Sequence, residues 1–176
     1  GFGSNDLSYP DLLDYRARSD VFGGLLAHTM TQAAVGEREQ SDVVWGEFVT
    51  GNFFDVLKVR MQHGRGFLPE EDLTPGTHPV VVLSDDLWRK RFDADPGLVG
   101  RQVQLNGRPL TVVGVAPPEF TGAKWALGLK FWVPLMSRQY VSGGTNNWVT
   151  TRGSHWIEVL ARLKPGVTRE QASAAM

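Results

Sequence analysis

The sequence predicts an α+β fold in which short helices accompany mixed β-sheets. Three observations carry this prediction. A serine that can cap a helix follows the apolar run Val80–Leu83, and Asn106-Gly107 joins two strand-like segments. The segment His155–Leu163 alternates apolar and polar residues, as a half-buried strand does. Signals for helices and strands therefore interleave along the whole chain.

The first third predicts a helix, a hairpin and a second short helix. Ser8 and Pro10 are typical of a helix start, so we expect a helix from near residue 8 to near residue 19. The segments Phe22–Val35 and Ser41–Thr50 predict the two strands of a hairpin. Asn52–Leu57 predicts one or two helical turns, capped by the asparagine.

The middle of the chain begins with an irregular segment, residues 60–79. Its acidic triplet Glu70–Asp72 lacks the alternating spacing and the glycine of a calcium loop, so we expect a solvated loop. Ser84 then caps a helix that has Asp85 and Asp86 in its first turn and Arg89–Arg91 at its end. Both charge placements oppose the helix dipole favourably.

The last elements follow from turn chemistry. Asn106-Gly107 is the residue pair of a type I′ turn and predicts a hairpin. Phe131–Leu135 contains a proline and predicts a short strand at a sheet edge. Residues 138–154 predict an exposed loop, and Thr168 with Gln171 predicts a capping box for a terminal helix.

Composition excludes several classes of function. The chain has 176 residues, 41% hydrophobic and 21% charged, which is typical of one globular domain. Its 18 basic and 19 acidic residues give a net charge of −1, which disfavours nucleic acid as a partner. The absence of cysteine removes disulfides, thiol nucleophiles and cysteine-based zinc sites. The longest aliphatic run, Val80–Leu83, is too short to span a bilayer.

Motifs for catalysis or cofactor binding are missing. The four histidines are scattered without metal-ligand spacing, and no phosphate-binding loop is present. We therefore expect no metal, no cofactor and no enzymatic activity. A hydrolase built from Ser84, Asp86 and His155 is an alternative, because nucleophiles occupy strand-to-helix junctions. The flanking glycines of such a junction are absent, so helix capping is favoured.

Tryptophans offer a candidate recognition surface. Trp132 and Trp156 lie in predicted strands and are expected in the core or between lobes. Trp125 and Trp148 lie in predicted loops, where exposed aromatic rings can mark a surface for a partner or for a lipid, peptide or glycan. A ligand-binding domain that uses Trp125 and Trp148 is therefore a second alternative.

Nine phrases in sequence order resemble one family. Taken together they are similar to the MacB-like periplasmic core domain of bacterial ABC-transporter permeases, of the large acidobacterial type, over nearly the whole chain. The phrases are Ser8–Arg16, Asn52–Leu57, Gly64–Asp72, Val80–Ser84, Leu87–Phe92, Asp95–Gly100, Leu105–Val115, Trp132–Leu135 and Ala161–Thr168.

The resemblance implies a fragment of a permease on the periplasmic face of the inner membrane. It implies a porter-like lobe, here residues 1–50 with 152–176, and an inserted lobe, residues 51–151. The expected partners are the transmembrane helices of the parent permease, an ATP-binding subunit or domain, a second permease copy and a periplasmic protein. The expected role is to couple ATP-driven conformational change to efflux or extraction of a substrate, without catalytic residues.

Overall fold

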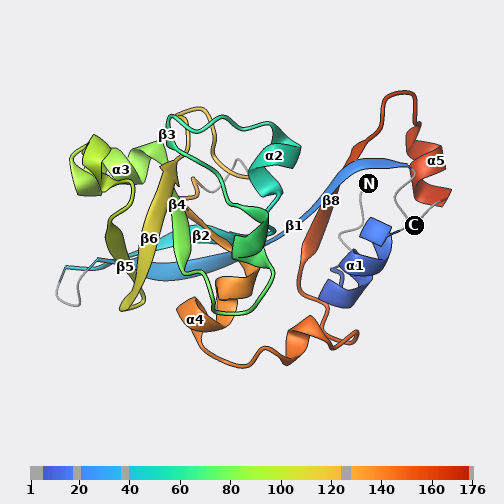
Figure 1. Ribbon diagram of the computed structural model, residues 1–176, viewed down its shortest axis with the longest axis horizontal. Helices are drawn as coiled ribbons and strands as arrows, with labels where there is room; N and C mark the ends of the chain where they lie inside the picture. Colours follow the sequence, from blue (N-terminus) through green and yellow to red (C-terminus); the bar gives the residue numbers. More distant parts are fainter. Residues whose placement is uncertain (1–5, 18–20, 37–39, 124–127, 175–176) are drawn as a thin grey trace.

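The computed structural model describes residues 6–17, 21–36, 40–123 and 128–174. Figure 1 shows a strand-rich part, covered by α2 and α3, and a second part formed by α1, β8 and α5. The strands are β1 (Phe22–Val35), β2 (Asp42–Val49), β3 (His63–Gly64), β4 (Val80–Leu83), β5 (Gln102–Leu105), β6 (Arg108–Val115), β7 (Phe131–Pro134) and β8 (Glu158–Leu163). The α-helices are α1 (Tyr9–Ala17), α2 (Phe53–Leu57), α3 (Asp85–Phe92), α4 (Arg138–Ser142) and α5 (Arg169–Ala174), and the 3₁₀ helices include η1 (Pro69–Asp72), η2 (Pro96–Leu98), η4 (Leu135–Ser137) and η5 (Asn147–Val149).

Six strands of the mixed sheet close into a ring. The pairings run β1–β2–β7–β4–β6–β5 and return to β1. The closing contact is short: Val35 pairs with Leu105, and the amide of Asn106 donates to the carbonyl of Ala34 over 2.8 Å. The predicted α+β fold with mixed sheets is confirmed.

Strand β1 belongs to both parts of the molecule. Residues 28–35 pair with β2 within the ring, whereas residues 22–28 pair with β8. Figure 1 shows β1 running without interruption from the strand-rich part to the part that contains α1, β8 and α5. The two parts therefore share one continuous strand.

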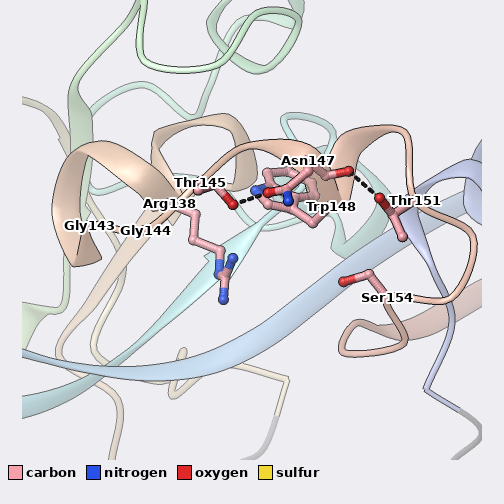
Figure 2. A pocket seen from close by; sticks show the side chains of 8 residues that line it. All are labelled: Arg138, Gly143, Gly144, Thr145, Asn147, Trp148, Thr151 and Ser154. Carbon is pink, nitrogen blue, oxygen red and sulfur yellow. Dashed lines mark hydrogen bonds between the residues drawn. The ribbon is translucent and has the colours of Figure 1, made fainter.

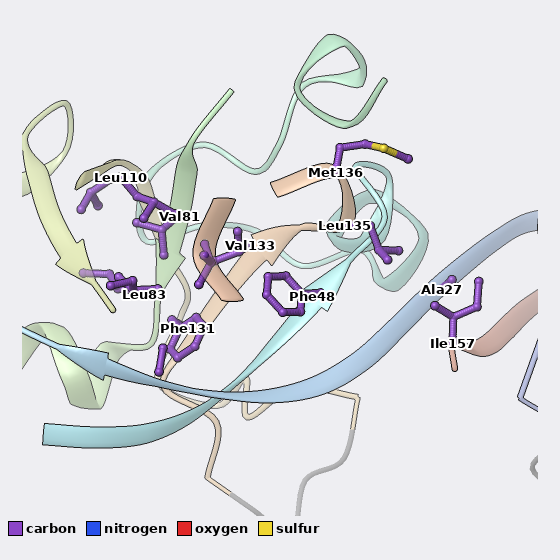
Figure 3. Packing of buried hydrophobic residues seen from close by; sticks show 14 of the residues in the cluster. Ala27, Phe48, Val81, Leu83, Leu110, Phe131, Val133, Leu135, Met136 and Ile157 are labelled. Atoms are coloured by element: carbon purple, nitrogen blue, oxygen red, sulfur yellow. The ribbon is translucent and has the colours of Figure 1, made fainter. Parts of the chain in front are cut away.

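Alternation along the strands separates two hydrophobic clusters. On β4, Val81 and Leu83 join the larger cluster, whereas Val80 and Val82 join the smaller one. The same alternation places Phe131 and Val133 in the larger cluster and Trp132 in the smaller. Figure 3 shows how side chains of the larger cluster, from Leu110 to Ile157, extend along the ring toward β1 and β8.

Local cap and turn signals are confirmed. The Ser84 hydroxyl accepts the amide of Leu87 over 3.1 Å at the start of α3. Asn106 and Gly107 have φ of 51° and 71°, as a type I′ turn requires. The amide of Thr168 donates to the Gln171 side chain over 2.9 Å, as in a capping box. The first helix and the first hairpin also form where the sequence predicts them.

Some expectations about position are wrong. β7 is not an edge strand, because it pairs with β2 on one side and β4 on the other, and all four of its residues are buried. Pro134 is tolerated there because it is the last residue of the strand. The Asn52 side chain does not cap α2; instead its amide donates to the carbonyl of Leu25 over 2.9 Å.

The acidic triplet is not a solvated loop. Glu71 and Asp72 are buried within η1, and only Glu70 is exposed. Burial raises the pKa of Glu71, but the Arg65 guanidinium at 2.8 Å and the amide of Leu68 outweigh it and hold the pKa below its usual range. The two buried carboxylates therefore fix the loop to the rest of the fold.

Candidate functional site

A surface pocket of about 300 Å³ lies beside Trp148, in the segment that connects β7 with β8. Figure 2 shows its lining side chains, which come from α4, from η5 and from the turns around them. No lining residue is acidic. The lining residues are Arg138, Gly143, Gly144, Thr145, Asn147, Trp148, Thr151 and Ser154.

Two glycines shape the rim of this pocket. Gly143 ends α4 with φ of 75°, and its amide donates to the carbonyl of Gln139 over 2.9 Å. Gly144 follows with φ of 88°, so the chain turns through two consecutive positions that L side chains rarely adopt. Nothing lies within 4 Å of where a Cβ would stand at either position, so the requirement is for backbone conformation.

Trp148 forms the inner wall of the pocket and is only 4% exposed. Its ring meets Tyr9 edge-on with 5.5 Å between centroids, and Trp156 with 4.9 Å. The expected exposure of residues 138–154 is therefore wrong at this position, because η5 turns the indole into the core. Its role in binding a partner or ligand stays a prediction. Trp125, the other predicted surface tryptophan, lies outside the described residues.

Arg138 brings a positive charge to the pocket. Its guanidinium carbon lies 4.4 Å from the centroid of the Trp156 ring, within the range of a cation–π contact. Among the described residues no carboxylate forms an ion pair with it. Arg138 therefore lines the pocket with a guanidinium that rests on an aromatic ring.

Two buried indole N–H groups belong to the same region. The indole nitrogens of Trp148 and Trp156 are buried, and neither has a hydrogen-bond partner in the part of the chain that is described. Such groups are rare in folded proteins, because a buried polar group without a partner costs free energy. The hydroxyl of Thr151 donates to the carbonyl of Asn147 over 2.7 Å and holds η5 in place (Figure 2).

A second polar group of interest joins α1 to the strand-rich part. The Arg16 guanidinium donates to the carbonyl of Leu25 over 3.3 Å and to the side-chain oxygen of Asn52 over 3.2 Å. The hydroxyl of Thr50 receives the amide of Ala27 over 3.0 Å and donates to Asn52. These contacts tie α1, β1 and the start of α2 into one junction.

Asp72 extends this junction to η4. Its carboxylate accepts the amides of Gly51 over 2.8 Å and Met136 over 3.1 Å. Burial raises the pKa of Asp72 to about 6, although these amides and the charge of Arg16 act in the opposite direction. The sequence missed Asp72 because its burial depends on contacts with residues far along the chain.

A buried polar trio lies in the smaller cluster, outside the ring of strands. Glu47 is fully buried and accepts the indole N–H of Trp132 over 3.0 Å through one carboxylate oxygen. Its other oxygen lies 3.1 Å from Nδ1 of His28, which is also buried. A glutamate between apolar strand residues was the available sequence signal, but it does not identify the partners.

The residues of the alternative hydrolase do not assemble. Ser84 caps α3, and Asp86 forms ion pairs with Lys90 and Lys130, each at 2.6 Å. His155 instead lies near α1, with its Nε2 3.9 Å from the carboxylate of Asp11. Ser84 therefore has neither of the two partners that a catalytic triad requires.

The described residues hold no group of three or more His, Asp or Glu side chains arranged for a metal ion. Over the same residues no helix reaches the length and apolar character needed to cross a bilayer.

Two solved structures share the fold of this chain. The periplasmic region of MacB from Actinobacillus actinomycetemcomitans matches with a TM-score of 0.74 and 18% identity, covering 99% of this chain and 76% of that one. The extracellular domain of the transporter YknZ from Gram-positive bacteria matches with a TM-score of 0.69 and 17% identity, covering 97% and 78%. At these identities the likeness shows the fold.

Sequence comparison adds a curated relative and a family. The chain is 26% identical over 125 residues to the macrolide export ATP-binding/permease protein MacB of Shigella dysenteriae, which is 70% of this chain and 18% of that protein. The chain thus spans about a fifth of that relative's length. Residues 2–176 match the MacB-like periplasmic core domain. The chain therefore belongs to the MacB-like periplasmic core domain family and is an extracytoplasmic domain of an ABC-transporter permease.

Proposed function

We propose that this domain couples ATP-driven conformational change in a permease to efflux or extraction of a substrate, without chemistry of its own. One observation carries the proposal: β1 is a single strand that pairs with β8 at one end and with the ring of strands at the other. A displacement of α1 and β8 would reach the ring through this strand, because strands in a closed hydrogen-bonded ring move together.

The polar junction supports rigid transmission. Arg16 of α1 reaches Leu25 on β1 and Asn52 before α2, and Asp72 connects Gly51 with Met136. Charge-assisted hydrogen bonds of this kind are stronger than neutral ones and hold a defined geometry. They resist the independent movement of α1 that would uncouple the two parts.

The proposed division into two lobes agrees with this role of β1. We assign residues 1–50 with 152–176 to a porter-like lobe and residues 51–151 to an inserted lobe. The hairpin of β1 and β2 then extends from the first lobe into the ring, where β2 pairs with β7. We propose as partners the transmembrane helices of the parent permease, an ATP-binding subunit or domain, a second permease copy and a periplasmic protein.

The contacts of Ser84, the serine that the sequence offers as a candidate nucleophile, support a domain without catalysis. Ser84 is 5% exposed, and its hydroxyl is engaged by the amide of Leu87. A nucleophile needs an adjacent base, and the contacts of Asp86 and His155 are made elsewhere. Capping accounts for this serine without a reaction.

The test uses the whole transporter, reconstituted with its ATP-binding partner. This chain has no cysteine. A spin label attached at Lys90→Cys, an exposed position on α3, is therefore the only label within the domain. A second variant carries labels at both Lys90→Cys and Leu160→Cys on β8. Cysteines elsewhere in the parent are replaced first, and electron-electron distances are measured with and without a non-hydrolysable ATP analogue.

Coupling through a rigid domain gives two results. The distance between the Lys90→Cys labels of two permease copies changes when nucleotide binds, while the distance from position 90 to position 160 within one copy stays constant. Arg16→Gln is expected to broaden the distribution of distances between positions 90 and 160. Arg101→Gln, which removes an exposed ion pair with Asp95, is expected to leave that distribution unchanged. If the distance between the Lys90→Cys labels of two copies is the same with and without the ATP analogue, the proposal is contradicted.

A further inference from the structure

We propose that the pocket beside Trp148 is a binding site for an oxyanion group, a carboxylate or a phosphate, of a small molecule. The site is independent of the coupling role, because its lining comes from the segment after β7 and not from the junction around Arg16. The pocket opens at the surface and has about 300 Å³ of space, which is enough for such a group and a few attached atoms.

Charge selects the class of ligand. Arg138 is the one ionisable side chain among the lining residues, and the others are glycines, hydroxyl side chains, one amide and one indole. A cation would be repelled, and an apolar group would have to displace water from hydroxyls that it cannot pair. A planar carboxylate or a phosphate matches the fork of N–H donors on a guanidinium.

Preorganisation distinguishes Arg138 from an ordinary surface arginine. The Trp156 ring fixes its guanidinium at 4.4 Å, and among the described residues no carboxylate competes for it. A side chain that is already held in place loses less conformational entropy when it binds. Ser154 lines the same pocket and can supply a hydroxyl donor, whereas the hydroxyls of Thr145 and Thr151 already donate to Asn147 (Figure 2).

The indole of Trp148 supplies an independent sign of an absent acceptor. Trp148 lines the pocket, and its indole nitrogen is buried and has no hydrogen-bond partner among the residues that the structure describes. An oxyanion in the pocket offers the acceptor that this N–H lacks. Because the nitrogen is covered, an anion in the pocket contacts it only if the ring moves, and the indole N–H resonance reports that movement.

The experiment is a titration of this domain, followed by the indole N–H resonances in ¹⁵N-correlated NMR spectra. Sodium acetate and inorganic phosphate are the two probes, and sodium chloride at matched ionic strength is the control for screening. The expected result is a saturable shift of the Trp148 and Trp156 resonances with a dissociation constant of about 1 mM. The probe that saturates at lower concentration identifies carboxylate or phosphate as the preferred group.

Variants locate the site. Arg138→Gln is expected to weaken binding by about tenfold or more, since it removes a charge-assisted contact, and Arg138→Lys is expected to lose part of the affinity. The matched control is Arg108→Gln: Arg108 also lies over an aromatic ring, 5.7 Å from the centroid of Tyr140, but does not line the pocket. Unchanged dispersion of the remaining amide resonances confirms folding of each variant.

Two outcomes overturn the proposal. If neither probe shifts the indole resonances beyond the chloride control, the pocket does not bind oxyanions. If a saturable shift survives intact in Arg138→Gln, or is lost equally in Arg108→Gln, the ion binds elsewhere.

Discussion

Nδ1 of His28 lies 3.1 Å from Oε1 of Glu47, and both side chains are buried beside the ring of strands. The second oxygen of Glu47 accepts the indole N–H of Trp132, so one carboxylate satisfies groups on β1 and β7. Gly122 approaches the same carboxylate, where an added Cβ would lie 3.2 Å from Oε2. This trio links three segments that are distant in sequence.

Replacing Glu47 tests whether the trio stabilises the fold. Glu47→Ala leaves the His28 and Trp132 nitrogens without their acceptor, and we expect the free energy of unfolding to fall by about 3–5 kcal/mol. Urea denaturation measures the change. Glu47→Gln, which keeps one carbonyl acceptor, is expected to cost less, and Glu119→Ala on the exposed surface is expected to stay within about 0.5 kcal/mol. Equal midpoints for Glu47→Ala and Glu119→Ala would contradict this role.

The pH dependence of Asp72 provides a second prediction. Its pKa is raised by burial to about 6, above the value of about 4 in an unfolded chain. The protonated group therefore contributes stability that is fully present below pH 4 and is lost as pH rises through 6. The contribution is at most about 3 kcal/mol.

Asp72→Asn isolates this contribution. The variant cannot ionise, and its NH₂ group replaces one of the two accepting oxygens, so either Gly51 or Met136 loses its acceptor; we expect a loss of about 1–3 kcal/mol at low pH. The difference in unfolding free energy between wild type and variant should shrink as pH rises from 4 to 7. A difference that is constant over this range would show that Asp72 has the same pKa in both states.

Short-range signals in the sequence predicted the helices, strands and turns. The position of each strand in the sheet depends on long-range contacts that the local sequence does not contain. Ser84 and the Asn106-Gly107 turn act on residues within four positions, so their geometry can be predicted from the local sequence. The position of β7 depends on β2 and β4, which are about 50 to 85 residues earlier in the chain. A proline was therefore misinterpreted as an edge signal, although it only ends the strand.

The candidate pocket was only partly visible in the sequence. Trp148 was singled out as an aromatic residue in a polar segment, but the sequence contains no sign that Tyr9 and Trp156 cover its ring. Arg138 was not singled out, because an arginine in a loop has no distinguishing pattern until its stacking on Trp156 is known. Asp72 was expected in a solvated loop for the same reason, since the amides that its carboxylate accepts belong to Gly51 and Met136, which are distant in sequence.

The cap of α3 gives a third prediction. Ser84→Ala removes the acceptor for the amide of Leu87 and should lower the free energy of unfolding by about 1 kcal/mol. Ser84→Asn, a residue that also caps helices, should recover part of that loss. Thermal melting followed by circular dichroism measures both. Transport by the parent permease should be unaffected at temperatures where the domain is folded, and loss of transport in the folded Ser84→Ala protein would favour the hydrolase alternative.

The turn between β5 and β6 gives the last prediction, because it separates backbone conformation from packing. Gly107 has φ of 71°, and no atom lies within 4 Å of where its Cβ would stand. The Cβ of Gly107→Val therefore meets open space, and the main expected cost is the left-handed backbone of a β-branched residue. We expect the free energy of unfolding to fall by about 1–2 kcal/mol. Gly107→Asn should cost less, since asparagine tolerates this region better than other side chains do. Equal melting temperatures for wild type and Gly107→Val would mean that the turn relaxes to another type without loss, and the hairpin would then be held by the pairing of β5 with β6 alone.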